Sequence, residues 1–326
     1  MEDLVGRAVE LARDAGDDDY TPVWAVLGEM AQDGPASLLA GVDLLASPDP
    51  VVRAVGCDLL GRASERHETV RADAASALLT LAPSETDVDV LWSIAQALGS
   101  TFDHRAEPVL VFLSAHPDPD VRLKAAQALP SMPAGEAVAG ALIRLTADPD
   151  PRVRNWATFG LGSQTDADTP AVREALWARV GDDGEDVHAE AVFGLARRRD
   201  PRATALVIEL LDAEQGIYSW GLEAAACLRD PALLPHLAGY DAASAPVATA
   251  LRECDPAARL RRDDFAAALL DAVYDRSPAA DPTVFSTLLE TGLTLRTTGA
   301  GGTLIWSVEA LMERAGGDPH RAAGEL

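Results

Sequence analysis

Two segments in the middle of the chain share one pattern: Asp118-Pro-Asp-Val-Arg-Leu-Lys-Ala-Ala-Gln-Ala-Leu129 and Asp148-Pro-Asp-Pro-Arg-Val-Arg-Asn-Trp-Ala-Thr-Phe-Gly-Leu161. Each has an Asp-Pro turn, then a Val-Arg pair, then a run of mostly small residues that closes on leucine. Counting similar segments on both sides, the leading residues stand at 52, 90, 121, 153, 187 and 220, which gives steps of 38, 31, 32, 34 and 33 residues. A repeat of such regular length indicates one structural unit stacked several times.

Each copy predicts the second helix of a two-helix unit. The aspartate supplies an oxygen for the unpaired amides of the first turn, and proline suits the first helical position. If the leading residue is position zero, then positions zero, four, five and eight carry Val, Ala, Ala and Leu and lie on one face. Apolar segments such as 138–145 and 205–211 predict the preceding helices. Neither helix would bury its apolar stripe alone, so neighbouring units must stack.

The repeat divides the chain into three parts. We expect an N-terminal helical cap over residues 1–33, a solenoid over 34–229 and a degenerate helical C-terminal cap over 230–326. In the last part the apolar pattern predicts helices at about 256–275, 283–296 and 303–315. The sequence therefore predicts an all-α protein without a β-sheet.

The composition and charge of the chain limit the kinds of partner that it can bind. The 326 residues carry a net charge of −25 and have a pI near 4.4, so the chain should repel phosphate backbones, and we expect no nucleic-acid partner. The N-terminus lacks a basic segment and no apolar run approaches the ~18 residues of a membrane span. We therefore expect a cytoplasmic protein without a membrane partner.

The sequence offers no evident reaction chemistry. Cys57, Cys227 and Cys254 are far apart and lack the spacing of metal ligands, so we expect no metal. We find no nucleophile with an adjacent base and no phosphate-binding loop, and expect neither a catalytic residue nor a cofactor.

The repeats resemble HEAT repeats, in particular the short alanine-rich kind found in phycobilin lyase subunits. The resemblance covers about residues 34 to 229 and implies a right-handed α-solenoid, an armadillo-like helical stack whose second helices line the concave side. It also implies that acids and arginines of successive turns form structural ladders. The ladder residues on this basis are Asp49, Arg53, Asp120, Arg122, Asp150 and Arg154.

Positions two, three and six of the second helices should face outward, and in this fold outward means the concave groove. The candidate groove residues are Trp92, Gln96, Leu123, Lys124, Gln127, Asn155, Trp156, Phe159, Glu190, Phe193 and Glu223. They include the chain's single lysine and single asparagine, and exposed aromatic residues usually mark recognition. The alternative is a helical phase shifted by one position, which would place Trp156 and Phe159 partly in the core.

Three functions are compatible with such a protein. The first is a non-catalytic scaffold that binds a peptide or helix of a partner protein, with a basic segment favoured by the acidic surface. The second is a ligand- or chromophore-handling enzyme subunit, as the resemblance to bilin lyase subunits implies. The third is a DNA glycosylase, because alkylpurine glycosylases also use HEAT-like repeats, but the acidic charge opposes duplex binding.

Overall fold

A computed structural model describes residues 1–15, 19–213, 218–286, 291–299 and 302–326. The chain divides into two compact units. The first comprises Met1–Ala175 with Asp182–Val187, and the second comprises Leu176–Gly181 with His188–Leu326.

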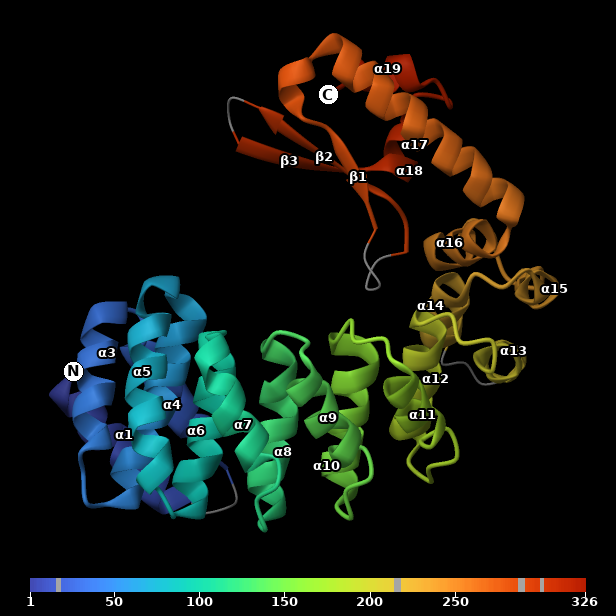
Figure 1. The fold of residues 1–326 in the computed structure, drawn as a ribbon. Coiled ribbons are helices and arrows are strands. Elements are labelled where there is room, and N and C mark those ends of the chain that lie inside the picture. Colours follow the sequence, from blue (N-terminus) through green and yellow to red (C-terminus); the bar gives the residue numbers. More distant parts are fainter. Residues whose placement is uncertain (16–18, 214–217, 287–290, 300–301) are drawn as a thin grey trace. The chain divides into compact units, whose positions relative to one another are not determined.

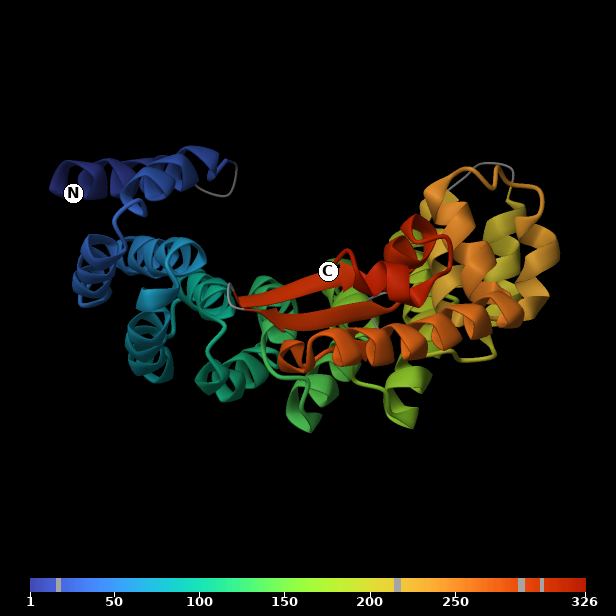
Figure 2. The same ribbon diagram turned by 90° about the horizontal axis from the view of Figure 1, so that it is seen from above.

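The first unit is a row of antiparallel helix pairs (Figure 1). It contains α1 (Glu2–Ala15) and α2 (Thr21–Met30), followed by the pairs α3 (Gly34–Leu45) with α4 (Pro50–Arg66), α5 (Arg71–Leu81) with α6 (Val88–Thr101), α7 (Glu107–Leu113) with α8 (Pro119–Ala128), and α9 (Glu136–Leu145) with α10 (Pro151–Phe159). The helices α1 and α2 form a separate layer (Figure 2) and share an apolar core with α4. The next helices are α11 (Pro170–Trp177) and α12 (Glu185–Arg197), in which the division between the units falls.

Burial in the first unit confirms the helical phase read from the sequence. Val121, Ala125 and Leu129, at positions zero, four and eight of the α8 copy, are fully buried. The glycines that close the motif have a packing role, because they let the second helices approach closely. A Cβ atom on Gly61 would lie 3.1 Å from Ala97 Cα, and one on Gly99 would lie 2.9 Å from Ala128 Cβ. The second helices α4, α6 and α8 therefore pack directly against one another.

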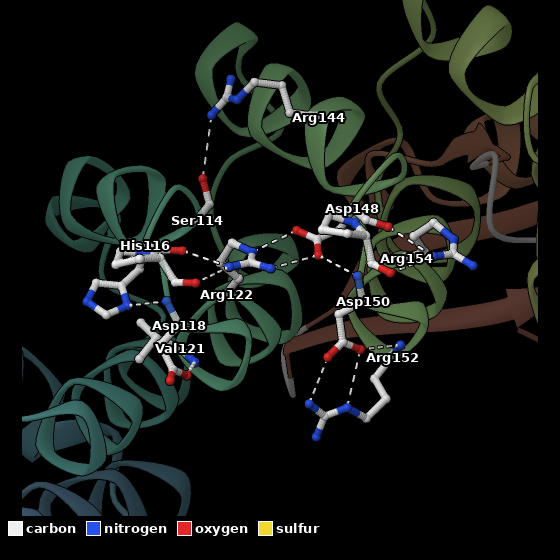
Figure 3. A network of polar contacts seen from close by, with 12 residues as sticks. Ser114, His116, Asp118, Val121, Arg122, Arg144, Asp148, Asp150, Arg152 and Arg154 are labelled. Carbon is white, nitrogen blue, oxygen red and sulfur yellow. Dashed lines mark hydrogen bonds and ion pairs between the residues drawn. The ribbon is translucent and has the colours of Figure 1, made fainter.

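An arginine near the start of α8 ties two turns together (Figure 3). Arg122 donates from Nη1 to the carbonyl oxygens of His116 and Pro117 in its own turn, at 2.9 and 2.8 Å. Its Nε and Nη2 reach Asp148 in the next turn, at 2.7 and 2.9 Å. Asp148 in turn accepts from the amide of Asp150 at 2.9 Å. A single guanidinium thus fixes the geometry of two consecutive turns.

Arg53 and Arg154 repeat this arrangement. Arg53 donates to the carbonyl oxygens of Ser47 and Pro48 and pairs with Glu85. In the same way, Arg154 donates to the carbonyl oxygens of Asp148 and Pro149 and pairs with Asp182. The three aspartates expected in the ladder lie in the same turns but have other partners. Asp49 caps α4 and pairs with Arg13. Asp150 caps α10 and pairs with Arg152, which also pairs with Asp120.

The second unit continues with helices and ends in a small α/β module. Its elements are α13 (Ala203–Asp212), α14 (Tyr218–Leu228), α15 (Leu234–Leu237), α16 (Ala245–Cys254), α17 (Pro256–Arg276), β1 (Thr283–Phe285), β2 (Thr294–Gly299), β3 (Gly302–Ser307), α18 (Val308–Arg314) and α19 (Pro319–Ala323). The three strands form an antiparallel sheet in the order β1-β2-β3. Leu295 of β2 is fully buried in one core with Leu269 of α17 and Leu311 of α18.

The sheet corrects the sequence prediction of a purely helical C-terminal cap without β-structure. The helix expected at 256–275 is present as α17. In place of the helix expected at 283–296 the described residues form β1 and the start of β2, while 287–290 lie outside the described residues. Of the helix expected at 303–315 only α18 is present. In β2, the alternating residues Leu295 and Thr297 are buried while Arg296 and Thr298 are exposed, which is the two-residue period of a strand. The threonines there and Ile305 and Trp306 in β3 also favour strand structure.

The ladder carboxylates should stabilise the fold near neutral pH. Burial opposes ionisation of Asp148, but the hydrogen bonds from Arg122 and the backbone outweigh it, so the pKa of Asp148 lies below its ordinary value. A lowered carboxyl pKa contributes stability above the unfolded-state pKa, and this contribution is lost as the pH falls through the folded-state pKa.

We expect Asp148→Ala to lower the free energy of unfolding by about 3 kcal/mol at pH 7, because it leaves the largely buried Arg122 without its carboxylate. Asp168→Ala is the control: its pair with Arg173 is about one-third exposed, and its loss should cost at most about 1 kcal/mol. Urea denaturation followed by circular dichroism measures both. Equal losses in the two variants would contradict a special role of the ladder.

Candidate binding surface of the first unit

The first unit carries eight of the expected groove residues on α6, α8 and α10. They are Trp92, Gln96, Leu123, Lys124, Gln127, Asn155, Trp156 and Phe159. Seven of them are half-buried and Trp156 is 39% exposed. Trp156 thus lies at the surface, whereas Phe159, the other residue that a shifted phase would place partly in the core, is half-buried.

Two aromatic contacts lie on this surface. The Lys124 Nζ atom of α8 lies over the Trp92 ring of α6, 4.2 Å from its centroid. Trp156 and Phe159 pack edge to face on α10, with ring centroids 5.7 Å apart. The first contact joins neighbouring repeats, as equal or adjacent positions on stacked second helices should.

Between α6 and α8 lies a cleft of about 240 Å³, which we call the glutamine cleft. Its lining residues are Glu65, Gln96, Gly99, Ser100, Phe102, Lys124, Gln127, Ala128 and Ser131. The side-chain amides of Gln96 and Gln127 make no hydrogen bond with any residue that the structure describes. Within the same described residues, Lys124 forms no ion pair, and its Nζ atom lies over the Trp92 ring. The cleft therefore presents donors and acceptors that are open to a ligand.

A buried carboxylate lies on the same helix face, one repeat earlier. Asp58 of α4 is 2% exposed, and its Oδ2 accepts a hydrogen bond from the Tyr20 hydroxyl at 2.9 Å. Its Oδ1 has no hydrogen-bond partner in the part of the chain that the structure describes. Burial raises the pKa of Asp58 to about 6, although Tyr20, Ser93 and the charges of Lys124 and Arg62 act to lower it. Burial in turn lowers the pKa of Lys124, which the negative charge of Asp58 partly restores.

Several of these residues were not predicted from the sequence, although their positions in the repeat were readable. Asp58 occupies position six of the first copy, the same column as Gln96 and Gln127. Ser100 and Ser131 follow those glutamines by four residues, so they belong to the same helical stripe. Tyr20 lies outside the repeats, and no spacing connects it with Asp58.

A second group of charges borders the cleft. Glu65 pairs with Arg62 at 2.8 Å and accepts a hydrogen bond from the Ser100 hydroxyl at 3.2 Å. The Arg62 guanidinium lies over the Trp24 ring of α2, 4.8 Å from its centroid. The N-terminal helices thus contribute directly to the edge of this surface.

The remaining three expected groove residues lie in the second unit. Phe193 of α12 packs edge to face against Trp220 of α14, with centroids 5.6 Å apart. Glu223 is exposed, whereas Glu190 is buried, being only 6% exposed. The outward orientation expected for position three thus holds for Glu223 and not for Glu190.

A second hollow of the first unit, of about 530 Å³, lies at the first helices and turns. Its lining residues are Ala82, Pro83, Glu85, Thr86, Leu91, Pro108, Val109, Phe112, Leu113 and His116. Phe112 is 74% exposed there, and the Glu85 carboxylate is already engaged by Arg53. This hollow is mostly apolar and differs in character from the glutamine cleft.

Two other kinds of feature are absent from the described residues. No three His, Cys, Asp or Glu side chains among them gather as metal ligands would. No helix among them combines the length and the apolar character needed to cross a bilayer.

The fold and the repeated turn network define an α-solenoid, and comparison with known families identifies its repeats. Residues 40–130 and 106–189 match the family of HEAT repeats. This part of the chain is therefore built of HEAT repeats, as the sequence resemblance predicted.

Individual proteins resemble this chain in sequence or in fold. Protein YibA of Escherichia coli K12 is 35% identical over 96 residues, which are 29% of this chain and 34% of YibA, so the match spans about a third of that relative. The crystal structure of YibA superposes with a TM-score of 0.58 at 21% identity, covering 77% of this chain and 95% of YibA, and so shares the fold. The complex of CpcE and CpcF of phycocyanin lyase from a Nostoc species gives a TM-score of 0.43 at 18% identity, covering 67% of this chain and 86% of that one. That last score is too low to carry a functional argument.

The buried environment of Asp58 predicts that the free energy of unfolding depends on pH. Its folded-state pKa near 6 exceeds the ordinary carboxyl value near 4, so ionisation destabilises the folded state as the pH rises from about 4 to above 6. We expect Asp58→Asn to gain stability relative to the wild type between pH 4 and pH 8, by about 2 kcal/mol. Urea denaturation at several pH values measures this difference. Asp43→Asn, at an exposed position of α3, is the control and should show little change.

Proposed function

We propose that this chain is a binding protein and that the second-helix surface of its first unit holds an extended segment of a partner protein. The observation that carries the proposal is the pair of glutamines in the glutamine cleft. Gln96 and Gln127 occupy the same position in adjacent repeats, line one cleft and have amides without partners among the described residues.

An amide side chain suits a peptide backbone because it both donates and accepts hydrogen bonds, as the backbone does. Two amides on neighbouring helices would bond successive parts of a chain laid across them, largely independent of its side chains. Lys124, between them, would meet a carbonyl or carboxylate of that segment. The acidic surface of the whole protein favours basic residues elsewhere in the partner.

The exposed aromatic residue supplies the second element of recognition. Trp156 is large, 39% exposed and held by Phe159, so a partner would bury much area against a side chain that is already ordered. Tryptophan is among the residues that most often dominate the binding energy of an interface.

The size of the glutamine cleft favours a peptide over a chromophore. Its volume of about 240 Å³ lies below the roughly 300–1,000 Å³ of typical small-molecule sites and suits one side chain or a short piece of backbone. The alternative function, handling of a flat ligand, would instead use the hollow at Phe112, whose volume of about 530 Å³ falls within that range.

The test is selection of random peptides from a display library on the wild-type protein, followed by affinity measurement on variants. We expect Trp156→Ala and the double variant Gln96→Ala with Gln127→Ala to weaken the selected peptides at least tenfold while the melting temperature changes little. Trp177→Ala is the matched control, because Trp177 is 37% exposed but lies on α11, a first helix.

Selected peptides that bind all variants like the wild type would contradict the proposed surface. Peptides that lose affinity only in Phe112→Ala would favour the hollow at the first helices instead. The same variants, used as bait in the native host, would then show whether a natural partner follows the same pattern.

A further inference from the structure

The outer edge of the C-terminal sheet is open. Strand β3 lies at the end of the order β1-β2-β3, and among the described strands it pairs only with β2. Its residues are exposed except Trp306, which is half-buried, and Leu304 and Ile305 are 49% and 68% exposed. A strand in this position presents a row of backbone N–H and C=O groups that can pair with another strand.

This edge lacks the usual protection against pairing. Soluble proteins protect open edges with charged side chains, prolines or very short strands. The other edge follows that rule, since β1 has three residues and comes directly after Pro282. By contrast, Gly302-Thr-Leu-Ile-Trp-Ser307 contains neither a charge nor a proline. In a chain with a net charge of −25, an uncharged open edge with two exposed aliphatic residues indicates that something covers it.

The hairpin also lacks a third strand along much of its length. Strand β1 pairs only with Thr294–Arg296 of β2, so the outer half of the β2–β3 hairpin is two-stranded (Figure 1). Two-stranded hairpins are marginally stable in water, and a third strand is what usually stabilises them. A strand added beside β3 would supply it.

We propose that β3 pairs antiparallel with β3 of a second copy of this chain. The three strands contain Arg296 as their only charged residue, so two copies can meet here without bringing acidic side chains together. A twofold axis closes the β3 edges of both copies in one contact. This dimer is independent of the peptide-binding surface proposed for the first unit.

The alternation of side chains restricts the register. Ile305 shares a face with Arg296, its cross-strand neighbour, while Leu304 and Trp306 share the face of the buried Leu295 and Thr297. A twofold axis perpendicular to the sheet must pair residues of the same face. The register that buries most apolar surface sets Ile305 opposite the partner's Ile305 and Leu304 opposite the partner's Trp306.

Sedimentation equilibrium of the full chain over a concentration series tests the dimer. We expect the wild type to dimerise, and to do so more tightly as salt is added, because salt screens the repulsion between two acidic copies. Ile305→Glu should be monomeric, since two carboxylates would face each other in the dimer, while Arg296 accommodates the new charge within each copy. Leu39→Glu is the matched control, because Leu39 is 69% exposed on α3, and it should dimerise like the wild type.

A charge-swap mixture tests the register. Ile305→Glu and Ile305→Lys should each be monomeric alone and should form a mixed dimer when combined, because opposite charges then meet at the central pair. Restoration of the dimer supports the pairing, and failure to restore it overturns this register. A wild-type monomer throughout the concentration series, or a dimer that Ile305→Glu leaves intact, overturns the proposal.

Discussion

The first unit depends on one recurring interaction, in which an arginine near the start of α4, α8 and α10 binds two carbonyls of its own turn and a carboxylate of the next. Because the guanidinium is planar and rigid, it fixes the distance and the angle between the two turns together. Arg53, Arg122 and Arg154 do this with nearly the same atoms. Each carboxylate also holds a backbone amide of its own turn, so the start of each following second helix is set by the repeat before it.

The binding surface is a consequence of this spacing. Once the turns are fixed, Gly61 and Gly99 allow the second helices to approach until backbone and small side chains touch. Side chains at equal positions then become neighbours, which is why Lys124 reaches Trp92 and why Gln96 and Gln127 line the same cleft. A helix pair with bulky residues at the glycine positions would separate these groups.

The sequence predicted the parts of the fold that rest on a repeated burial pattern. The valine, alanines and leucine at positions zero, four, five and eight mark the buried face of each second helix, so the helical phase was readable without a structure. The partners in the ladder could not be predicted in this way. A turn can hold two acids two residues apart, such as Asp148 and Asp150, and the spacing does not say which of them caps the helix. The strands after residue 282 were missed for a related reason: short apolar runs such as 303–306 fit a helix or a strand equally well until their partners are known. Asp58 escaped notice because its partner Tyr20 comes from outside the repeats.

The single lysine of the chain gives the glutamine cleft a chemical consequence. Amine-directed reagents would find one side chain, Lys124, besides the terminal amino group. Burial lowers the pKa of this amine, so more of it is in the uncharged, nucleophilic form at a given pH than for an ordinary surface lysine. A fluorophore or a short cross-linker attached through its amine would therefore report on the cleft between α6 and α8 without any engineered residue.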